Sequence, residues 1–122
     1  FKCKFFLAGG PDDEDLIKKV MSSSIGKNCI SFAAMDIAET IPIIATCKYC
    51  ISNDTGFGHI SAGLGLQSLM LFIDSPPNAY GMYTKNISIL VPEGKTIETT
   101  THDTLGTISL DEVLKNALEI MN

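Results

Sequence analysis

A short run of the sequence, NDTGFGH, carries the residues best suited to bind a charged ligand. It begins at Asn53, directly after an apolar run, and within six positions it brings together an acid, a hydroxyl, two glycines and a histidine. Small and apolar residues follow, and they predict a helix that begins within this run. Because the run has no acid after Asp54, the free N–H groups at the start of that helix are open to an anion.

Each polar residue of the run has a role that fits such a ligand. Gly56 and Gly58 allow the backbone to come within hydrogen-bonding distance, and Thr55 offers both its hydroxyl and its N–H group. His59 can supply a donor or a partial positive charge, while Asp54 can accept from a sugar hydroxyl or cap the helix. We interpret these five residues as a binding site for a polar, phosphorylated ligand.

A structural interpretation of the same run stays open. In that interpretation Asp54 is only a helix cap, the glycines only shape the turn, and His59 is a hydrogen-bonded core residue. A second glycine turn, GGPDDED at residues 9–15, has the opposite electrostatics. Its acids occupy the positive end of the following helix and would repel a phosphate, so we interpret that turn as structural.

Other chemical motifs in the sequence are weak. Cys47 and Cys50 have C-x-x-C spacing, but they leave a predicted helix and enter a predicted strand, where no helix start lowers a thiol pKa. Without a second pair, a zinc site is not expected there. His102 stands alone in a polar stretch. No G-x-S-x-G, Walker A or G-x-G-x-x-G pattern is present, and we expect neither a metal nor a cofactor.

Composition limits the class of protein. The chain has 122 residues, 45% hydrophobic and 19% charged, which predicts one domain over residues 1–122 with a buried core. A net charge of −5 with scattered basic residues argues against a nucleic-acid surface. Without a run of about 20 apolar residues, we expect a cytoplasmic protein. The four cysteines are interpreted as reduced core residues, and the start at Phe1, in a strand-like segment, suggests a piece of a longer chain.

Apolar patterning predicts strands that alternate with helices. The predicted strands are residues 2–8, 28–32, 48–52, 68–73 and 86–92. The predicted helices are 13–23, 35–47 with a bend at Pro42, one at the NDTGFGH run that contains the small residues 61–63, and 110–121. Ser109 and Glu112 have the spacing of a capping box. Residues 74–81 are expected to be an irregular loop, and residues 93–107 weak strand or loop. This order predicts an α/β fold: a doubly wound, mainly parallel sheet with helices on both faces.

Residues 50–72, CISNDTGFGHISAGLGLQSLMLF, resemble the C-terminal half of the ADP-heptose:lipopolysaccharide heptosyltransferases. These bacterial glycosyltransferases are of the GT-B type, with two facing Rossmann-like domains. The family's hallmark is a strand followed by Asp-Ser/Thr-Gly-x-x-His and a small-residue helix, and Asp54, Thr55, Gly56 and His59 match it in place. The strand, Gly-Gly-Pro turn and acidic helix start of residues 1–20 are also similar, and the likeness covers residues 2–92.

The resemblance implies a donor site for a nucleotide sugar, with an ADP-sugar favoured. In the family this turn holds the diphosphate and the sugar, and the segment before the second helix lines the base, which implies that Met35 lies beside adenine. The catalytic base, and the contacts to a saccharide or lipid-linked acceptor, would belong to an N-terminal domain. The resemblance implies a cytoplasmic enzyme and leaves peripheral attachment to the inner membrane open.

We therefore expect the donor-binding half of an inverting glycosyltransferase. It would take part in moving a heptose-like sugar from a nucleotide diphosphate sugar to a hydroxyl of a saccharide or lipopolysaccharide acceptor, and alone it would bind the donor without turnover. Two alternatives stay open. One is a stand-alone nucleotide-binding or regulatory module without transferase activity, and the other is a structural domain in which the motif serves only packing.

Overall fold

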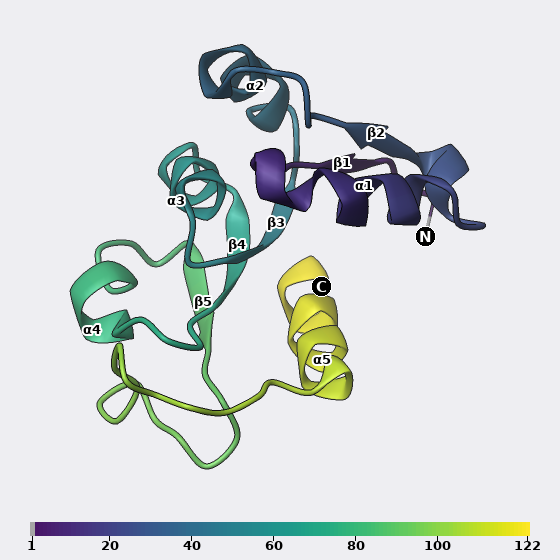
Figure 1. Cartoon of the computed structure of the whole chain (residues 1–122). Coiled ribbons are helices and arrows are strands. Elements are labelled where there is room, and N and C mark those ends of the chain that lie inside the picture. Colours follow the sequence, from purple (N-terminus) through teal and green to yellow (C-terminus); the bar gives the residue numbers. More distant parts are fainter. Residues whose placement is uncertain (1) are drawn as a thin grey trace. The chain divides into compact units, whose positions relative to one another are not determined.

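The computed structural model describes residues 2–122, which form two compact units, residues 2–42 and residues 43–122. In each unit the paired strands are parallel and helices connect them (Figure 1). The α/β class with parallel strands is therefore confirmed. The single domain over residues 1–122 stays a prediction.

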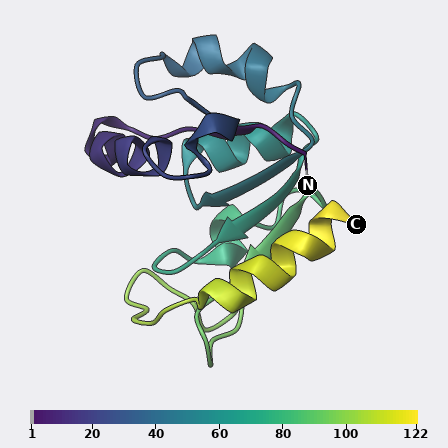
Figure 2. The same ribbon diagram turned by 90° about the vertical axis from the view of Figure 1, so that its right-hand side faces the viewer.

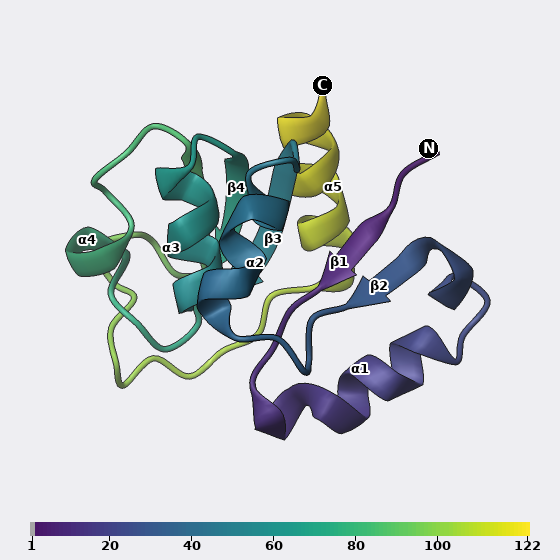
Figure 3. The ribbon, with the colours of Figure 1, turned by 90° about the horizontal axis from the view of Figure 1, so that it is seen from above.

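The first unit contains two strands and a helix. β1 (Phe5–Leu7) pairs with β2 (Cys29–Ser31), and α1 (Glu14–Met21) connects them and packs against β2 (Figure 3). Both strands are shorter than predicted. The rings of Phe6 and Phe32 stack with their centroids 5.1 Å apart, and Phe32 is buried. This apolar contact ties the end of β2 to β1.

Helix α2 (Ile37–Ile44) crosses the sequence boundary between the units and carries Pro42 in its interior. It begins where the Glu39 carboxylate accepts a hydrogen bond from the Asp36 N–H at 3.0 Å, which satisfies one of the free amides of the helix start. It is shorter at both ends than predicted. Two 3-10 turns, Pro11–Asp13 and Gly26–Asn28, precede α1 and β2.

The second unit is a three-stranded parallel sheet in the order β3-β4-β5, formed by Tyr49–Asn53, Gln67–Leu71 and Ile87–Leu90. Helix α3 (Gly56–Gly63) joins β3 to β4, and α4 (Pro77–Tyr80) lies between β4 and β5. Helix α5 (Leu110–Met121) lies across the sheet face opposite α3 (Figures 1 and 2). Helices on both faces are therefore confirmed in this unit.

The core of the second unit lies between the sheet and α5. Leu69, Leu90 and Ala117 form its buried centre, and partly buried apolar residues pack around them, among them Val113. The central strand β4 is buried on both faces, since Ser68, Leu69 and Met70 are inaccessible to solvent. This burial explains the unbroken apolar run that the sequence shows there.

Helix α5 has the bounds that the sequence predicted. Its N-cap is Ser109, whose hydroxyl accepts a hydrogen bond from the Glu112 N–H at 3.2 Å. That bond is one half of the predicted capping box.

Two predictions about local structure were wrong. Residues 74–81 are not wholly irregular, because α4 forms there: Pro76 is extended and Pro77 occupies the first helical position, where its missing N–H costs nothing. The cysteines are all free thiols, yet only Cys29 is fully buried, and Cys3 is exposed rather than part of the core. Among residues 2–122, no helix is long and apolar enough to cross a membrane.

Candidate functional site

The carboxyl ends of the three strands of the second unit meet at one edge of the sheet. Asn53 pairs with Leu71, and Leu71 pairs with Leu90, so the segments that follow them leave the sheet side by side. Ligands of parallel α/β sheets bind at this edge. Residues 54–59 follow β3 there, which places the predicted anion-binding run where such a sheet binds ligands.

The turn between β3 and α3 is sharp. The Asp54 N–H still bonds to the Leu71 carbonyl at 3.2 Å, so the chain leaves the sheet directly after this residue. Thr55 is the N-cap of α3 with an extended backbone, and the helix begins at Gly56. The first helical bond runs from the His59 N–H to the Thr55 carbonyl at 3.2 Å. The amides of residues 56–58 therefore precede the first helical bond, as at any helix start.

Within residues 2–122, no side chain caps the start of α3. The Thr55 hydroxyl makes no capping bond and instead lies 2.9 Å from the Ser52 hydroxyl. Asp54, which the sequence offered as a possible cap, is bonded to His59 instead. The first turn of α3 contains no acid. The positive end of this helix is thus left for a ligand or for water.

The starts of α1 and α5 carry acids of the protein itself, whereas the four-residue helix α4 has neither a side-chain cap nor an acid in its first turn. Before α1, the Gly10 N–H donates to the Asp13 carboxylate at 2.9 Å, and further acids follow in the first turn. At α5, the Ser109 hydroxyl takes the Glu112 N–H, with two acids in the first turn. The structural interpretation of the GGPDDED turn is supported by this geometry. α3 differs from α1 and α5 in having no acid in its first turn, and from α5 also in having no side-chain cap.

A chain of hydrogen bonds joins Asp54, His59 and Tyr83. Nε2 of His59 lies 2.7 Å from Oδ1 of Asp54, and Nδ1 lies 2.7 Å from the Tyr83 hydroxyl. The Tyr83 ring is tilted against the imidazole, with centroids 5.7 Å apart. An ionised carboxylate can only accept, so in a neutral ring Nε2 carries the proton and Tyr83 donates to Nδ1. Both nitrogens of His59 are thus paired within the protein.

Tyr83 stays a hydroxyl donor through neutral pH. Burial, and secondly the nearby negative charge of Asp54, raise the pKa of the Tyr83 phenol above its usual value. Since both causes disfavour the phenolate, the proton of the hydroxyl is retained. The Asp54 carboxylate is also the group that a protonated His59 would pair with most strongly.

The two glycines of the run have different surroundings. A Cβ atom on Gly56 would meet nothing within 4 Å, so its backbone faces open space. A Cβ atom on Gly58 would lie 2.8 Å from the Met70 methyl and 3.0 Å from the Ser52 hydroxyl. Gly58 therefore lets α3 pack closely on the sheet, while Gly56 leaves the helix start accessible.

Met35 belongs to the first unit. It lies in the turn that follows β2, is half-buried, and its N–H bonds to the Phe32 carbonyl at 2.9 Å. This places it beyond the carboxyl end of its own strand. The other five predicted site residues lie together in the second unit, and the structure brings Asp54 and His59 into direct contact.

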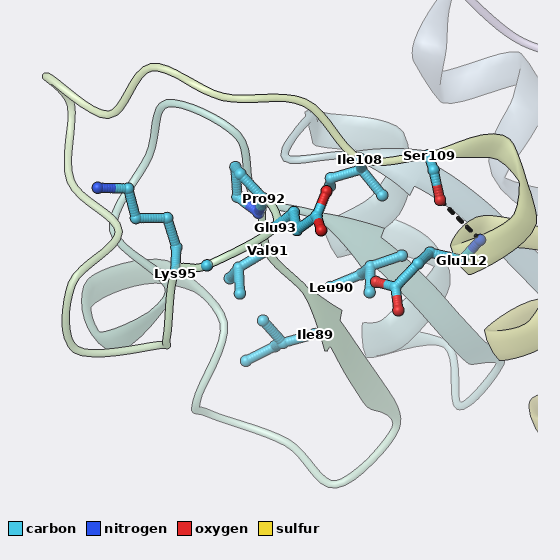
Figure 4. Close-up of a pocket in the computed structure, with 10 residues that line it drawn as sticks. Ile89, Leu90, Val91, Pro92, Glu93, Lys95, Ile108, Ser109 and Glu112 are labelled. Carbon is cyan, nitrogen blue, oxygen red and sulfur yellow. Dashed lines mark hydrogen bonds between the residues drawn. The ribbon is translucent and has the colours of Figure 1, made fainter.

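A pocket that the sequence did not indicate lies at the carboxyl end of β5. Its volume is about 390 Å³, and residues 89–95, Ile108, Ser109 and Glu112 line it. Figure 4 shows the carboxylates of Glu93 and Glu112 among its apolar walls, with Lys95 extending away. With two carboxylates and one lysine in its lining, this pocket carries a net negative charge and suits a diphosphate less well than the start of α3 does.

The C-x-x-C pair of Cys47 and Cys50 is not reactive in the structure. Burial raises the pKa of the Cys50 thiol, and burial together with Cys50 raises the pKa of Cys47, so both thiols stay protonated and unreactive.

Tyr83 is a residue of the site that the sequence did not indicate. It lies 24 residues after His59, and no spacing rule joins a lone tyrosine in a loop to a distant helix start.

Comparison with known proteins gives two findings. The model of glycosyltransferase family 9 (heptosyltransferase) matches residues 1–108. Among solved structures, that of E. coli ADP-heptose lps heptosyltransferase II is similar in fold, with a TM-score of 0.76 at 19% sequence identity. The likeness covers 97% of this chain and 36% of that protein, so this chain spans about a third of its length.

These findings confirm the resemblance drawn from residues 50–72 and the Rossmann-like α/β fold that it implied. None of the curated proteins compared matches the chain.

Proposed function

The chain belongs to glycosyltransferase family 9 (heptosyltransferase), and from that premise we propose that it holds the nucleotide-sugar donor of a glycosyl transfer reaction. The transferred sugar is heptose-like, the favoured donor is an ADP-sugar, and the acceptor is a hydroxyl of a saccharide or of lipopolysaccharide. The chain spans 36% of the similar E. coli heptosyltransferase. In this proposal, the catalytic base and the acceptor contacts therefore lie on an N-terminal domain outside residues 1–122.

The single observation that carries the proposal is the uncapped start of α3. Family membership points to a donor with a diphosphate, and α3 offers free amides at the ligand-binding edge of the sheet with no acid in its first turn and with the adjacent Asp54 paired to His59. A helix start binds phosphate through these N–H groups and through its dipole. α1 and α5 both carry two acids in their first turns, which would repel a phosphate, and the pocket at β5 has carboxylates in its wall.

The role of the site in the reaction follows from its charge. When the bond between the sugar and the diphosphate breaks, negative charge grows on the diphosphate oxygens. Fixed N–H donors of Gly56 and Gly58 stabilise that charge without having to reorganise. The Thr55 N–H and hydroxyl add donors, and His59, paired with Asp54, places a ring able to carry positive charge beside them. No residue of this site removes the acceptor proton.

Met35 lines the nucleotide base in this proposal. Its support is its place as a half-buried residue in the turn after β2, since a flexible thioether packs well against a planar ring. Replacement of Met35 by Ala should weaken ADP binding but leave inorganic pyrophosphate binding unchanged. Equal weakening of both probes would remove Met35 from the base pocket.

The test places an acid at the start of α3. A Cβ atom at Gly56 meets open space, so Gly56→Asp fits without a clash, and an acid in the first turn stabilises a helix by roughly 0.3–1 kcal/mol. The proposal expects this variant to be at least as stable as the wild type and yet to lose most of its affinity for ADP and ADP-sugar. Calorimetric titration and a thermal melt measure the two quantities.

The matched control is Gly56→Asn, which has a side chain of similar size and no charge. It should retain much more affinity than Gly56→Asp. Equal binding by the wild type and by Gly56→Asp would contradict the proposal. A full-length protein that binds the donor and transfers no sugar would favour the alternative of a binding or regulatory module.

A further inference from the structure

The hydrogen-bonded chain Asp54–His59–Tyr83 ends at the solvent with Tyr83. The side chain of Asp54 is 17% exposed and that of His59 is 32% exposed, whereas Tyr83 is 58% exposed. Because both ring nitrogens of His59 are paired, an arriving anion meets the Tyr83 hydroxyl and not a free imidazole nitrogen.

In the unliganded arrangement Tyr83 has no proton to offer an anion. The Asp54 carboxylate accepts from Nε2–H, so the second nitrogen of a neutral ring carries a lone pair and the Tyr83 O–H points to it. The phenol oxygen can then only accept. A phosphate oxygen also only accepts. In the unliganded arrangement, therefore, no hydrogen bond can form between the Tyr83 oxygen and a phosphate oxygen.

We propose that Tyr83 is a ligand-contacting residue of this site, and that His59 takes up one proton from solvent when a diphosphate binds. The proton adds to Nδ1, the new Nδ1–H donates to the Tyr83 oxygen, and the Tyr83 O–H turns to donate to the anion. No bond between heavy atoms forms or breaks, and one proton per site leaves the solvent. This inference rests on the proposed function, since it needs a diphosphate at the site.

The charges around His59 favour this change once the anion is present. Asp54 and the anion stabilise the imidazolium from two sides, while the start of α3 opposes it. Strand β4 beneath α3 has no titratable side chain, and the titratable residues of β3 are Tyr49 and Cys50, at the opposite end of the strand. Asp74 and Lys85 are the charged residues of the adjoining loops, and the ring's two hydrogen bonds go to Asp54 and Tyr83.

The test measures proton uptake by calorimetry. ADP is titrated into the full-length protein at pH 8, above the range in which phosphate groups take up protons, in two buffers that differ in their enthalpy of ionisation. The difference in binding enthalpy gives the number of protons exchanged. We expect uptake approaching one proton per ADP for the wild type, and none for adenosine, which carries no anion.

The variant is Tyr83→Phe, which keeps the ring packing and removes only the hydroxyl. We expect its affinity for ADP to fall about tenfold, the loss of one hydrogen bond to a charged group. Tyr80→Phe is the matched control. It lies in α4 three residues earlier, its ring packs edge-on against His102, and its affinity should be unchanged.

A spectroscopic readout in the unliganded protein checks the contact itself. The ¹⁵N resonance of His59 Nδ1 should move in Tyr83→Phe, because the lone pair loses its donor, and should stay in place in Tyr80→Phe.

The outcomes separate this inference from the proposed function. ADP binding without proton uptake, or Tyr83→Phe binding as tightly as the wild type, overturns the role of Tyr83 and leaves the donor site standing. A wild-type protein that binds neither ADP nor UDP nor GDP overturns the donor site and the role of Tyr83 together.

Discussion

Asp54 and His59 stand five positions apart in the sequence, and in the structure their side chains are 2.7 Å apart. Their clustering could be predicted, because a residue at a strand end and one in the next helical turn must lie close together. Their mutual bond could not, since Asp54 had two further roles open to it, as a cap and as a ligand to a sugar. Tyr83 could not be predicted at all, because only the path of the chain through β4 and α4 brings it to His59.

At the residue scale, His59→Ala should weaken ADP binding. The change removes the ring that can carry positive charge and that holds the Tyr83 hydroxyl, whose hydrogen bond to a charged ligand contributes about 1.5–3 kcal/mol, or roughly tenfold or more in affinity. Calorimetric titration measures the effect. The control is His102→Ala, at the other histidine of the chain, which is exposed and should leave affinity unchanged. Wild-type affinity in His59→Ala would remove this residue from the site.

Gly58→Ala tests packing rather than binding. An added methyl would lie 2.8 Å from the Met70 methyl and 3.0 Å from the Ser52 hydroxyl, and overpacking of this kind costs about 1–3 kcal/mol. The free energy of unfolding, measured in denaturant, should fall by that amount. Gly63→Ala, in the same helix with open space around its Cβ position, should be neutral or stabilising. Equal effects in the two variants would show that α3 is not packed closely at Gly58.

At the scale of elements, the helices and strands with a strong local sequence pattern were predicted best. α5 was predicted to the residue because a capping serine precedes a long amphipathic pattern. β4 was predicted from its unbroken apolar run. α4 was not predicted because its four residues are too few to show a helical periodicity of apolar residues. β1 and β2 are shorter than predicted because an apolar run does not show where a strand ends.

The capping difference between α5 and α3 predicts opposite behaviour of two alanine variants. Ser109→Ala should lower the free energy of unfolding by about 1 kcal/mol, since it removes the bond to the Glu112 N–H, and should leave ADP affinity unchanged. Thr55→Ala should change stability less, because Thr55 makes no capping bond, and should weaken ADP binding. Denaturant melts and titrations of both variants check this. Loss of affinity in Ser109→Ala alone would place the site at α5 instead.

At the scale of the whole molecule, the parallel order of strands was predictable from the alternation of apolar runs and helices. The division of residues 2–122 into two compact units was not, because no composition shift or linker marks residue 42. Since the chain spans 36% of the similar heptosyltransferase, residues 1–122 by themselves should bind ADP and release no transfer or hydrolysis product from an ADP-sugar. Product analysis by mass spectrometry tests this, and turnover by residues 1–122 alone would contradict it.

The most direct test of the account follows the backbone amides at the start of α3. In ¹⁵N-labelled protein titrated with ADP, the largest shifts should occur at the amides of Gly56, Phe57 and Gly58, and the amides of Leu110, Asp111 and Glu112 at the start of α5 should stay in place. Saturable ADP binding that leaves residues 56–58 unperturbed would contradict the claim that this helix start receives the diphosphate.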